Sequence, residues 1–166
     1  MRRMTEENLK AAFAGESQAH VRYQLFSDKA QQEGKPNLAR LFHAIAYAER
    51  VHAFNHYDAL GQIRSSPENL EVAIAGESYE VEEMYPAYFE VAKLQKERDA
   101  LRSINYALRA EENHLSLYTQ AREPAAQGDV DVGAVYVCSV CGHTVVGEAP
   151  DRCPVCGKPR ASYRQF

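Results

Sequence analysis

The sequence lacks two features that would assign it to other classes of protein. Its 166 residues contain no apolar run as long as a secretory signal or a membrane span. It also lacks an excess of basic residues, since 19 Lys and Arg stand against 23 Asp and Glu, for a net charge of -4. Nothing in this balance favours nucleic-acid binding. We therefore expect a cytoplasmic globular protein of one or two domains, with no membrane and no nucleic-acid partner.

Cysteine is absent from the first 137 residues, and the four cysteines that follow form two Cys-x-x-Cys pairs. They are Cys138, Cys141, Cys153 and Cys156. In a cytoplasmic chain such pairs favour a metal site over disulfides. A glycine after each pair permits the tight turn that presents thiolates and backbone amides to one ion. Four thiolates predict a tetrahedral zinc or iron site, and the spacing leaves open the common alternative, a structural zinc ribbon.

A charged pair occupies an apolar helical stripe in the first half of the chain. The stripe consists of Leu38, Leu41, Phe42 and Ile45, and one turn further it reaches Glu49 and His52. Residues three apart on a helix project from one face toward the same point. A carboxylate buried without a partner costs several kcal/mol, so Glu49 must be protonated, paired or bound to metal.

The same pattern recurs later in the chain. Glu111 and His114 repeat the spacing after the apolar positions 101, 104 and 108. Residues 12–17 (AFAGES) resemble residues 73–78 (AIAGES), and each segment places a glutamate, Glu16 or Glu77, on its stripe. The intervals from Glu16 to Glu49 and from Glu77 to Glu111 are 33 and 34 residues. The chain therefore contains a duplicated helical hairpin, each copy supplying one Glu and one Glu-x-x-His.

Four helices are predicted, at about residues 5–32, 36–60, 66–94 and 98–122. Gly34 ends the first, Pro36 suits the first turn of the second, and Ser66 with Pro67 marks the start of the third. Pro86 lies within the third helix and should kink it, because it cannot donate to the carbonyl of Glu82. From residue 123 the sequence resembles a linker.

Four helices with these ligands match the general pattern of ferritin-like di-iron and di-manganese bundles. Carboxylate oxygens suit ferric iron, and bridging carboxylates can hold two ions at short range. Glu80, one turn after Glu77, is a seventh candidate, and the first repeat has Ala19 at the equivalent position. The alternative is a set of surface charges or a buried salt-bridge network. It is disfavoured because five glutamates lie on the inner stripes of the helices and two of them belong to matching Glu-x-x-His motifs.

The chain resembles rubrerythrins over nearly its whole length. The residues that carry the resemblance are Ala75-Gly76-Glu77, Met84-Tyr85-Pro86 and Ala110-Glu111-Glu112-Asn113-His114, followed by the two cysteine pairs. The resemblance implies a mainly α protein with three segments. They are a ferritin-like four-helix domain at 1–123, a linker at 124–134 and a rubredoxin-like domain with short strands at 135–166.

The resemblance also implies a ligand set. Two irons would be held by Glu16, Glu49, His52, Glu77, Glu80, Glu111 and His114, and a third by the four cysteines. Glu49 and Glu111 would bridge, Glu77 and His114 would bind one iron, and Glu16 would bind the other. On reduction that second iron would exchange Glu80 for His52. Tyr23 and Tyr85 would donate hydrogen bonds around the site, although aromatics on an inner stripe are also ordinary core residues.

The activity that these parts predict is the reduction of hydrogen peroxide to water. A di-iron pair supplies two electrons at once, and a four-thiolate iron relays single electrons from an external NAD(P)H-linked donor, a reductase or a rubredoxin. Two alternatives stay open. One is an oxygen-dependent ferroxidase or iron-handling protein, and the other is a non-enzymatic metal-binding module with a zinc ribbon.

The short connection near residues 61–66 predicts a domain-swapped homodimer. In a ferritin-like bundle the second and third helices run parallel, so the chain must climb about 30 Å between them at about 1.5 Å per helical residue. Six extended residues span at most about 24 Å. The first two helices of one copy should therefore complete a site with the last two of its twin.

Overall fold

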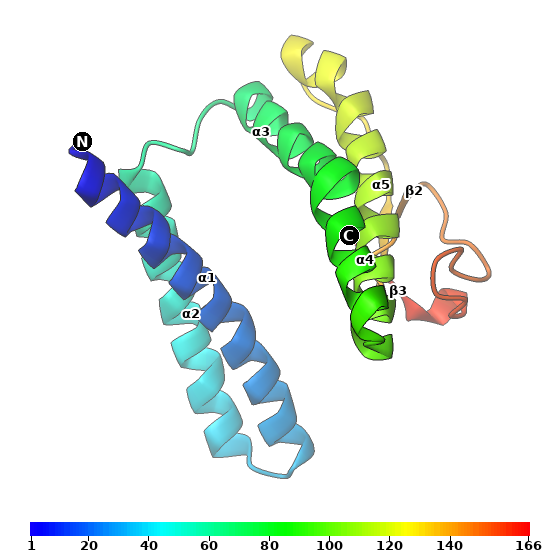
Figure 1. The fold of residues 1–166 in the computed structure, drawn as a ribbon, viewed down its shortest axis with the longest axis horizontal. Helices are drawn as coiled ribbons and strands as arrows, with labels where there is room; N and C mark the ends of the chain where they lie inside the picture. Colours follow the sequence, from blue (N-terminus) through cyan, green and yellow to red (C-terminus); the bar gives the residue numbers. More distant parts are fainter. The chain divides into compact units, whose positions relative to one another are not determined.

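The computed structural model describes residues 1–166, which divide into two compact units, 1–64 and 65–166 (Figure 1). Each unit is described by itself. None of the helices combines the length and the apolar character that a membrane-spanning segment needs.

The first unit is a hairpin of two long helices, α1 (Arg3–Gln32) and α2 (Pro36–Ala59), drawn in blue and cyan in Figure 1. Small residues form its contact, because Ala39, Ala46 and Ala53 recur every seven residues and are all buried. Two side chains of α1 bond to the α2 backbone across this contact. His20 Nδ1 lies 2.7 Å from the Ala46 carbonyl oxygen, and the Ser27 hydroxyl donates to that of Ala39 at 2.8 Å.

Three large apolar side chains of α2 are not part of this contact, although Phe42 packs against Tyr23 and Phe26 of α1. Leu38, Leu41 and Ile45 are 41%, 55% and 39% exposed, although the sequence pattern predicts that their stripe is buried. The prediction is wrong for the isolated hairpin for a geometric reason. A second helix covers only one side of α2, and the alanine stripe occupies that side. The stripe that leads to Glu49 is left uncovered within the first unit.

The second unit begins with α3 (Ser66–Tyr79), the π-helical turn η1 (Glu80–Met84) and α4 (Tyr85–Gln95). Ser65 rather than Ser66 caps α3, in a capping box with Glu68. The predicted single helix with a kink at Pro86 is instead interrupted by η1. Because Pro86 has no N–H, the register shifts just before it, and the Tyr85 amide bonds to the Glu80 carbonyl five residues back.

The last helix, α5 (Arg98–Gln127), packs along α3 and α4 and is longer than predicted. It continues past Arg122 through Pro124, and the Gly128 amide donates to the Pro124 carbonyl at 3.0 Å. Residues 123–127, expected to begin the linker, are therefore helical, which their two alanines favour. The Arg122 guanidinium donates twice to Glu71, at 2.8 and 3.0 Å, and so ties this end of α5 to α3.

A three-stranded antiparallel sheet completes the second unit, in the order β2-β1-β3. Its elements are β1 (Val135–Cys138), β2 (Thr144–Val146), the 3-10 turn η2 (Arg160–Ser162) and β3 (Tyr163–Gln165). Tyr136 pairs with Val145 on β2, and Val137 pairs with Arg164 on β3. The strand β2 lies beside α5 (Figure 1), where the Thr144 amide donates to the Asn113 side-chain oxygen at 3.2 Å.

Candidate metal centres

The four cysteines converge as the sequence predicts. The Sγ atoms of Cys138 and Cys156 lie 3.6 Å apart, and those of Cys141 and Cys153 lie 3.5 Å apart. All four atoms lie within 4.8 Å of one another. A disulfide requires about 2.05 Å, whereas thiolates about 2.3 Å from a tetrahedral ion lie about 3.8 Å apart. The cluster therefore has the geometry of a tetrahedral four-thiolate site.

Two equivalent backbone turns build this cluster. The amides of Gly142 and Gly157 donate to the carbonyls of Cys138 and Cys153, both at 2.9 Å. Both glycines have positive φ, +81° and +72°, a conformation that a side chain would disfavour. The predicted role of the glycine after each pair is confirmed.

The surroundings of Cys141 and Cys153 shift the pKa values of their thiols in opposite directions. Burial raises the pKa of Cys141 well above its ordinary value. Burial also acts to raise the pKa of Cys153, but hydrogen bonds from the Tyr163 hydroxyl and from the amides of Cys156 and Val155 lower it to about 6. Metal binding requires thiolates. The site thus contains one cysteine that ionises readily and donors that stabilise its negative charge.

In the second unit Glu77, Glu111 and His114 bring three ligand atoms together within 4.8 Å. His114 Nδ1 lies 2.6 Å from Glu111 Oε2, and these side chains are 27% and 19% exposed. Glu77 Oε2 is buried and has no hydrogen-bond partner. A buried polar atom without a partner in the protein is rare, and such a position suits a carboxylate oxygen that binds a metal ion.

The carboxylates of this cluster repel one another. Burial, a hydrogen bond with Glu111 and the negative charges of Glu111 and Glu80 raise the pKa of Glu77 to about 7. Burial and the charge of Glu111 also raise the pKa of Glu80. Carboxylates in such an environment gain most from a cation, because it removes the repulsion and supplies the missing partner.

In the first unit Glu16, Glu49 and His52 form a second cluster of the same kind. His52 Nδ1 lies 2.9 Å from Glu49 Oε2, the same contact that His114 makes with Glu111. The histidine of this half is more open, since the His52 side chain is 53% exposed against 27% for His114, whereas Glu49 and Glu111 are similar at 17% and 19%. Each hairpin therefore presents three ligands, in agreement with the duplication that the sequence predicts.

The other predicted site residues lie outside these two clusters. Glu80 is close enough to act on the charge of Glu77 but is not among the three converging ligands. Burial and the carboxylates of Glu80, Glu111 and Glu77 raise the pKa of Tyr85, which places its ring near the cluster. Tyr23 lies in the first unit among aromatic rings, 6.1 Å from Phe26 and 6.4 Å from Phe42.

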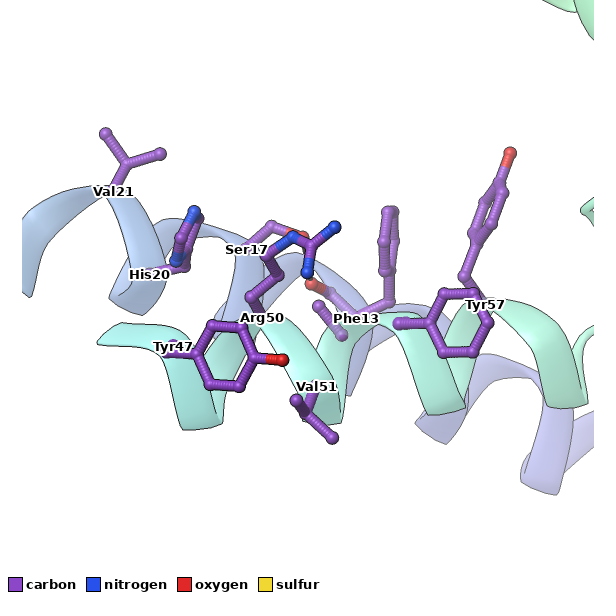
Figure 2. Close-up of a pocket in the computed structure, with 10 residues that line it drawn as sticks. Phe13, Ser17, His20, Val21, Tyr47, Arg50, Val51 and Tyr57 are labelled. Carbon is purple, nitrogen blue, oxygen red and sulfur yellow. Dashed lines mark hydrogen bonds between the residues drawn. The ribbon is translucent and has the colours of Figure 1, made fainter. Parts of the chain in front are cut away.

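Two features of the structure had no signal in the sequence. The first is Thr144, whose hydroxyl oxygen lies 2.9 Å from His114 Nε2 although the two residues are 30 positions apart. The second is an open groove of about 660 Å³ on the first unit. It is lined by Phe13, Ser17, His20 and Val21 of α1 and by Tyr47, Arg50, Val51, Ala53, Phe54 and Tyr57 of α2 (Figure 2). Successive helical residues differ by about 100°, which places the groove on the opposite flank of α2 from the Glu49 stripe.

The residues present fit iron at both sites. Carboxylate oxygens with imidazole nitrogens suit a di-iron carboxylate centre, and Glu77 Oε2 lacks the partner that a metal would provide. Four thiolates at tetrahedral spacing suit a rubredoxin-like iron. The helices and these ligand sets thus define a non-haem di-iron carboxylate protein with a four-cysteine iron domain.

Comparison with known proteins agrees with this class. The family model described as "Rubrerythrin" matches residues 7–122, and the model "Rubrerythrin, rubredoxin-like domain" matches residues 136–164. Rubrerythrin-2 of Clostridium acetobutylicum is 39% identical, over 98% of this chain and 97% of its own length. Nigerythrin of Nitratidesulfovibrio vulgaris is 32% identical, over 98% and 86%. A solved structure of nigerythrin in its fully reduced, all-ferrous state matches with a TM-score of 0.58 at 32% identity, over 98% of this chain and 86% of that one.

The chain belongs to the rubrerythrin family. The predicted fold class, a ferritin-like helical domain followed by a rubredoxin-like domain, is confirmed. The protein is an oxidoreductase with a di-iron carboxylate site and a four-cysteine site.

The raised pKa of Glu77 predicts a pH-dependent stability of the metal-free protein. Native Glu77 keeps its proton up to about pH 7, whereas the unfolded chain loses it near the ordinary value of 4.5. The free energy of unfolding should therefore fall as the pH rises through this interval. In Glu77→Gln this contribution is removed, and the decline becomes shallower. Urea titrations between pH 4 and 8 measure it, with Glu83→Gln, an exposed carboxylate of the same unit, as the control. Parallel profiles for wild type and Glu77→Gln would contradict the assignment.

Proposed function

We propose that the protein is a peroxidase that reduces hydrogen peroxide to water. The balanced reaction consumes two electrons and two protons for each peroxide and yields two waters. The observation that carries the proposal is the presence of two redox centres of different capacity in one chain, one made of Glu/His clusters and one of four thiolates. When bound, an iron pair supplies two electrons together, and a four-thiolate iron supplies single electrons.

The proposed ligands divide between the two hairpins. Glu16, Glu49 and His52 come from the first unit, and Glu77, Glu111 and His114 come from the second. We include Glu80 as a seventh ligand because its carboxylate acts on the same cluster. We propose that Tyr85, which lies near the carboxylates of the second unit, acts as a hydrogen-bond donor to that cluster. We propose the same role for Tyr23 beside the ligands of the first unit.

The four-cysteine domain is proposed to return electrons one at a time from an external donor. A donor linked to NAD(P)H, either a reductase or a rubredoxin, fits this role, because a four-thiolate iron changes its charge by one electron only. Three of the four cysteines are buried from water, Cys138 at 1%, Cys153 at 2% and Cys141 at 8% exposure, and Cys156 is partly buried. Residues 1–123 would thus carry the peroxide chemistry and residues 135–166 the relay.

Rapid mixing of the reduced protein separately with peroxide and with oxygen, under anaerobic control, tests this function. We expect faster oxidation by peroxide, with one peroxide consumed for every two electrons. Cys138→Ser should leave a single oxidation of the pre-reduced helical centre intact and slow turnover with the external donor. Faster reaction with oxygen would favour a ferroxidase. A colourless protein with stoichiometric zinc in the four-cysteine site would favour the metal-binding module.

We further propose that the working unit is a domain-swapped homodimer. Helix α2 continues from Glu49 to Ala59, and α3 begins at Ser66 before it reaches Glu77. These stretches span about 15 and 16 Å at about 1.5 Å per residue, so a return within one ferritin-like bundle requires about 30 Å. Residues 60–65 extend at most about 24 Å. The ligands of the first unit would therefore meet those of the second unit of a twin chain.

The apolar surface of the first unit supports this partner. The exposed stripe of Leu38, Leu41 and Ile45 leads directly to Glu49, so whatever covers the stripe also faces the ligands. Exposed apolar surface next to half of a ligand set is expected where a second copy completes the site.

Two differently tagged chains expressed together provide the test of the swap. One carries Glu49→Ala and His52→Ala, and the other carries Glu111→Ala and His114→Ala. In a swapped heterodimer one site receives both defects and the other receives neither, so one intact di-iron site returns. A purified heterodimer with two half-damaged sites and no intact one would contradict the swap, and the two homodimers serve as controls.

A further inference from the structure

Cys138 lies in the middle of a short row of residues across the three-stranded sheet. On one side the Cys138 amide donates to the His143 carbonyl at 2.9 Å. On the other side Cys138 pairs with Tyr163 of β3. Residues directly opposite each other on neighbouring strands project their side chains to the same face of a sheet. The side chains of His143 and Tyr163 therefore lie on the face that carries Cys138, and Tyr163 packs against the buried cysteine cluster.

The Tyr163 hydroxyl has two neighbours that can share its hydrogen bonds. His143 Nδ1 lies 2.8 Å from the hydroxyl oxygen, and the two rings meet edge to face at 90° with their centroids 6.1 Å apart. The second neighbour is Sγ of Cys153, with which the hydroxyl forms a hydrogen bond. Burial, this hydrogen bond and the negative charges of the thiolates raise the pKa of Tyr163. The phenol therefore keeps its proton and can act as a donor.

The hydroxyl has a single hydrogen, so it can donate to only one of these neighbours. A metal-bound thiolate can only accept, and a hydrogen bond to an anion is stronger than one between neutral groups. An imidazole nitrogen can take either role, because it donates when it carries the ring proton. The arrangement that satisfies both contacts has Tyr163 donating to Cys153 and His143 donating to the phenolic oxygen.

This hydroxyl makes the two cysteine turns different. Their backbone donors are equivalent, since the His143 amide donates to Cys141 and the Lys158 amide donates to Cys156, two residues further on in each case. Tyr163 comes from β3, outside both turns, and adds a side-chain donor to Cys153 in the second turn. The backbone of a Cys-x-x-Cys turn cannot supply such a donor.

We propose that Tyr163 raises the reduction potential of the four-cysteine iron by donating a hydrogen bond to Cys153, and that His143 is the positioning residue for its hydroxyl. Reduction transfers one electron from the external donor to ferric iron, and no bond forms or breaks. It adds one negative charge to the ion and its thiolates, and a hydrogen bond to sulfur stabilises this state. The consequence for the relay, easier uptake of electrons from the donor, rests on the proposed function.

NMR of the full-length protein with cadmium-113 in the four-cysteine site reads the direction of the hydrogen bond. A hydrogen bond to a ligated sulfur couples the donated proton to the metal nucleus, so the Tyr163 hydroxyl proton should show a coupling to cadmium. The amides of Val155 and Cys156, which donate to the same sulfur, are the internal control. Amide couplings without a hydroxyl coupling, or a hydroxyl proton coupled to the ring nitrogen of His143, would overturn the proposal.

A redox titration of the iron-loaded protein, followed by the visible colour of the ferric four-thiolate iron, reads the effect. Tyr163→Phe keeps the ring and should lower the potential, which corresponds to a reduction equilibrium constant about 3- to 10-fold smaller, the range of one net hydrogen bond. Tyr106→Phe is the matched control, because Tyr106 packs against the same cluster without a hydrogen bond to a cysteine. An unchanged potential in Tyr163→Phe, or an equal shift in Tyr106→Phe, would contradict the assignment.

His143→Phe tests the positioning role, because it keeps an aromatic ring and removes the Nδ1 donor. It should lower the potential of the wild type and leave that of Tyr163→Phe unchanged, since the two residues act through one hydroxyl. Equal shifts in both backgrounds would show that His143 does not act through Tyr163. None of these measurements uses peroxide, so a failure of the protein to reduce peroxide would count against the proposed function alone.

Discussion

Mutual repulsion among clustered carboxylates is the constraint on which the rest of this structure depends. Glu77 and Glu111 lie within 4.8 Å of one another and of His114, and the buried Glu77 Oε2 has no partner. A folded chain does not retain such an arrangement for its own stability, because each buried charge without a partner is destabilising. A bound cation replaces the repulsion between the carboxylates with attraction of each carboxylate to the metal. The helices therefore position ligands whose placement is favourable only when metal is present.

This constraint accounts for the hairpin architecture. The first hairpin packs along its buried alanines and leaves the stripe that leads to Glu49 uncovered, as Leu41 at 55% exposure illustrates. Three ligands are too few for two irons, so neither hairpin forms a complete centre by itself. The length of the six-residue connection between α2 and α3 limits which second hairpin can complete the centre. In the proposed swap, that second hairpin comes from another copy of the chain.

Much of this arrangement could be predicted from the sequence because it depends on short spacings. Glu49 with His52 and Glu111 with His114 are each one helical turn apart, and each cysteine pair is closed by one glycine turn. The start of α3 was also predicted to within one residue, since the cap is Ser65 and the sequence indicated Ser66. These features are local, so residue type and interval are sufficient to predict them.

The features that could not be predicted depend on contacts distant in sequence or on competing local effects. The exposure of Leu38 reflects the absence of a covering element, which periodicity does not report. The π-helical turn before Pro86 and the continuation of α5 through Pro124 are alternative responses to the same missing N–H, and the sequence favoured a kink and a stop. The contact of Thr144 with His114 joins residues 30 positions apart, and no motif announces it.

Thermal unfolding of the iron-loaded and the metal-free protein, compared at pH 7.5 and equal protein concentration, tests the central claim most directly. Near this pH Glu77 ionises, since its pKa is raised to about 7, and the repulsion between the carboxylates is strong. Metal that binds the native state alone adds stability by mass action, about 2.7 kcal/mol when the free ion is at about 100 times its dissociation constant. The account predicts that the helical transition of the metal-free protein lies well below that of the loaded protein. A metal-free helical domain that melts at the same temperature would contradict it.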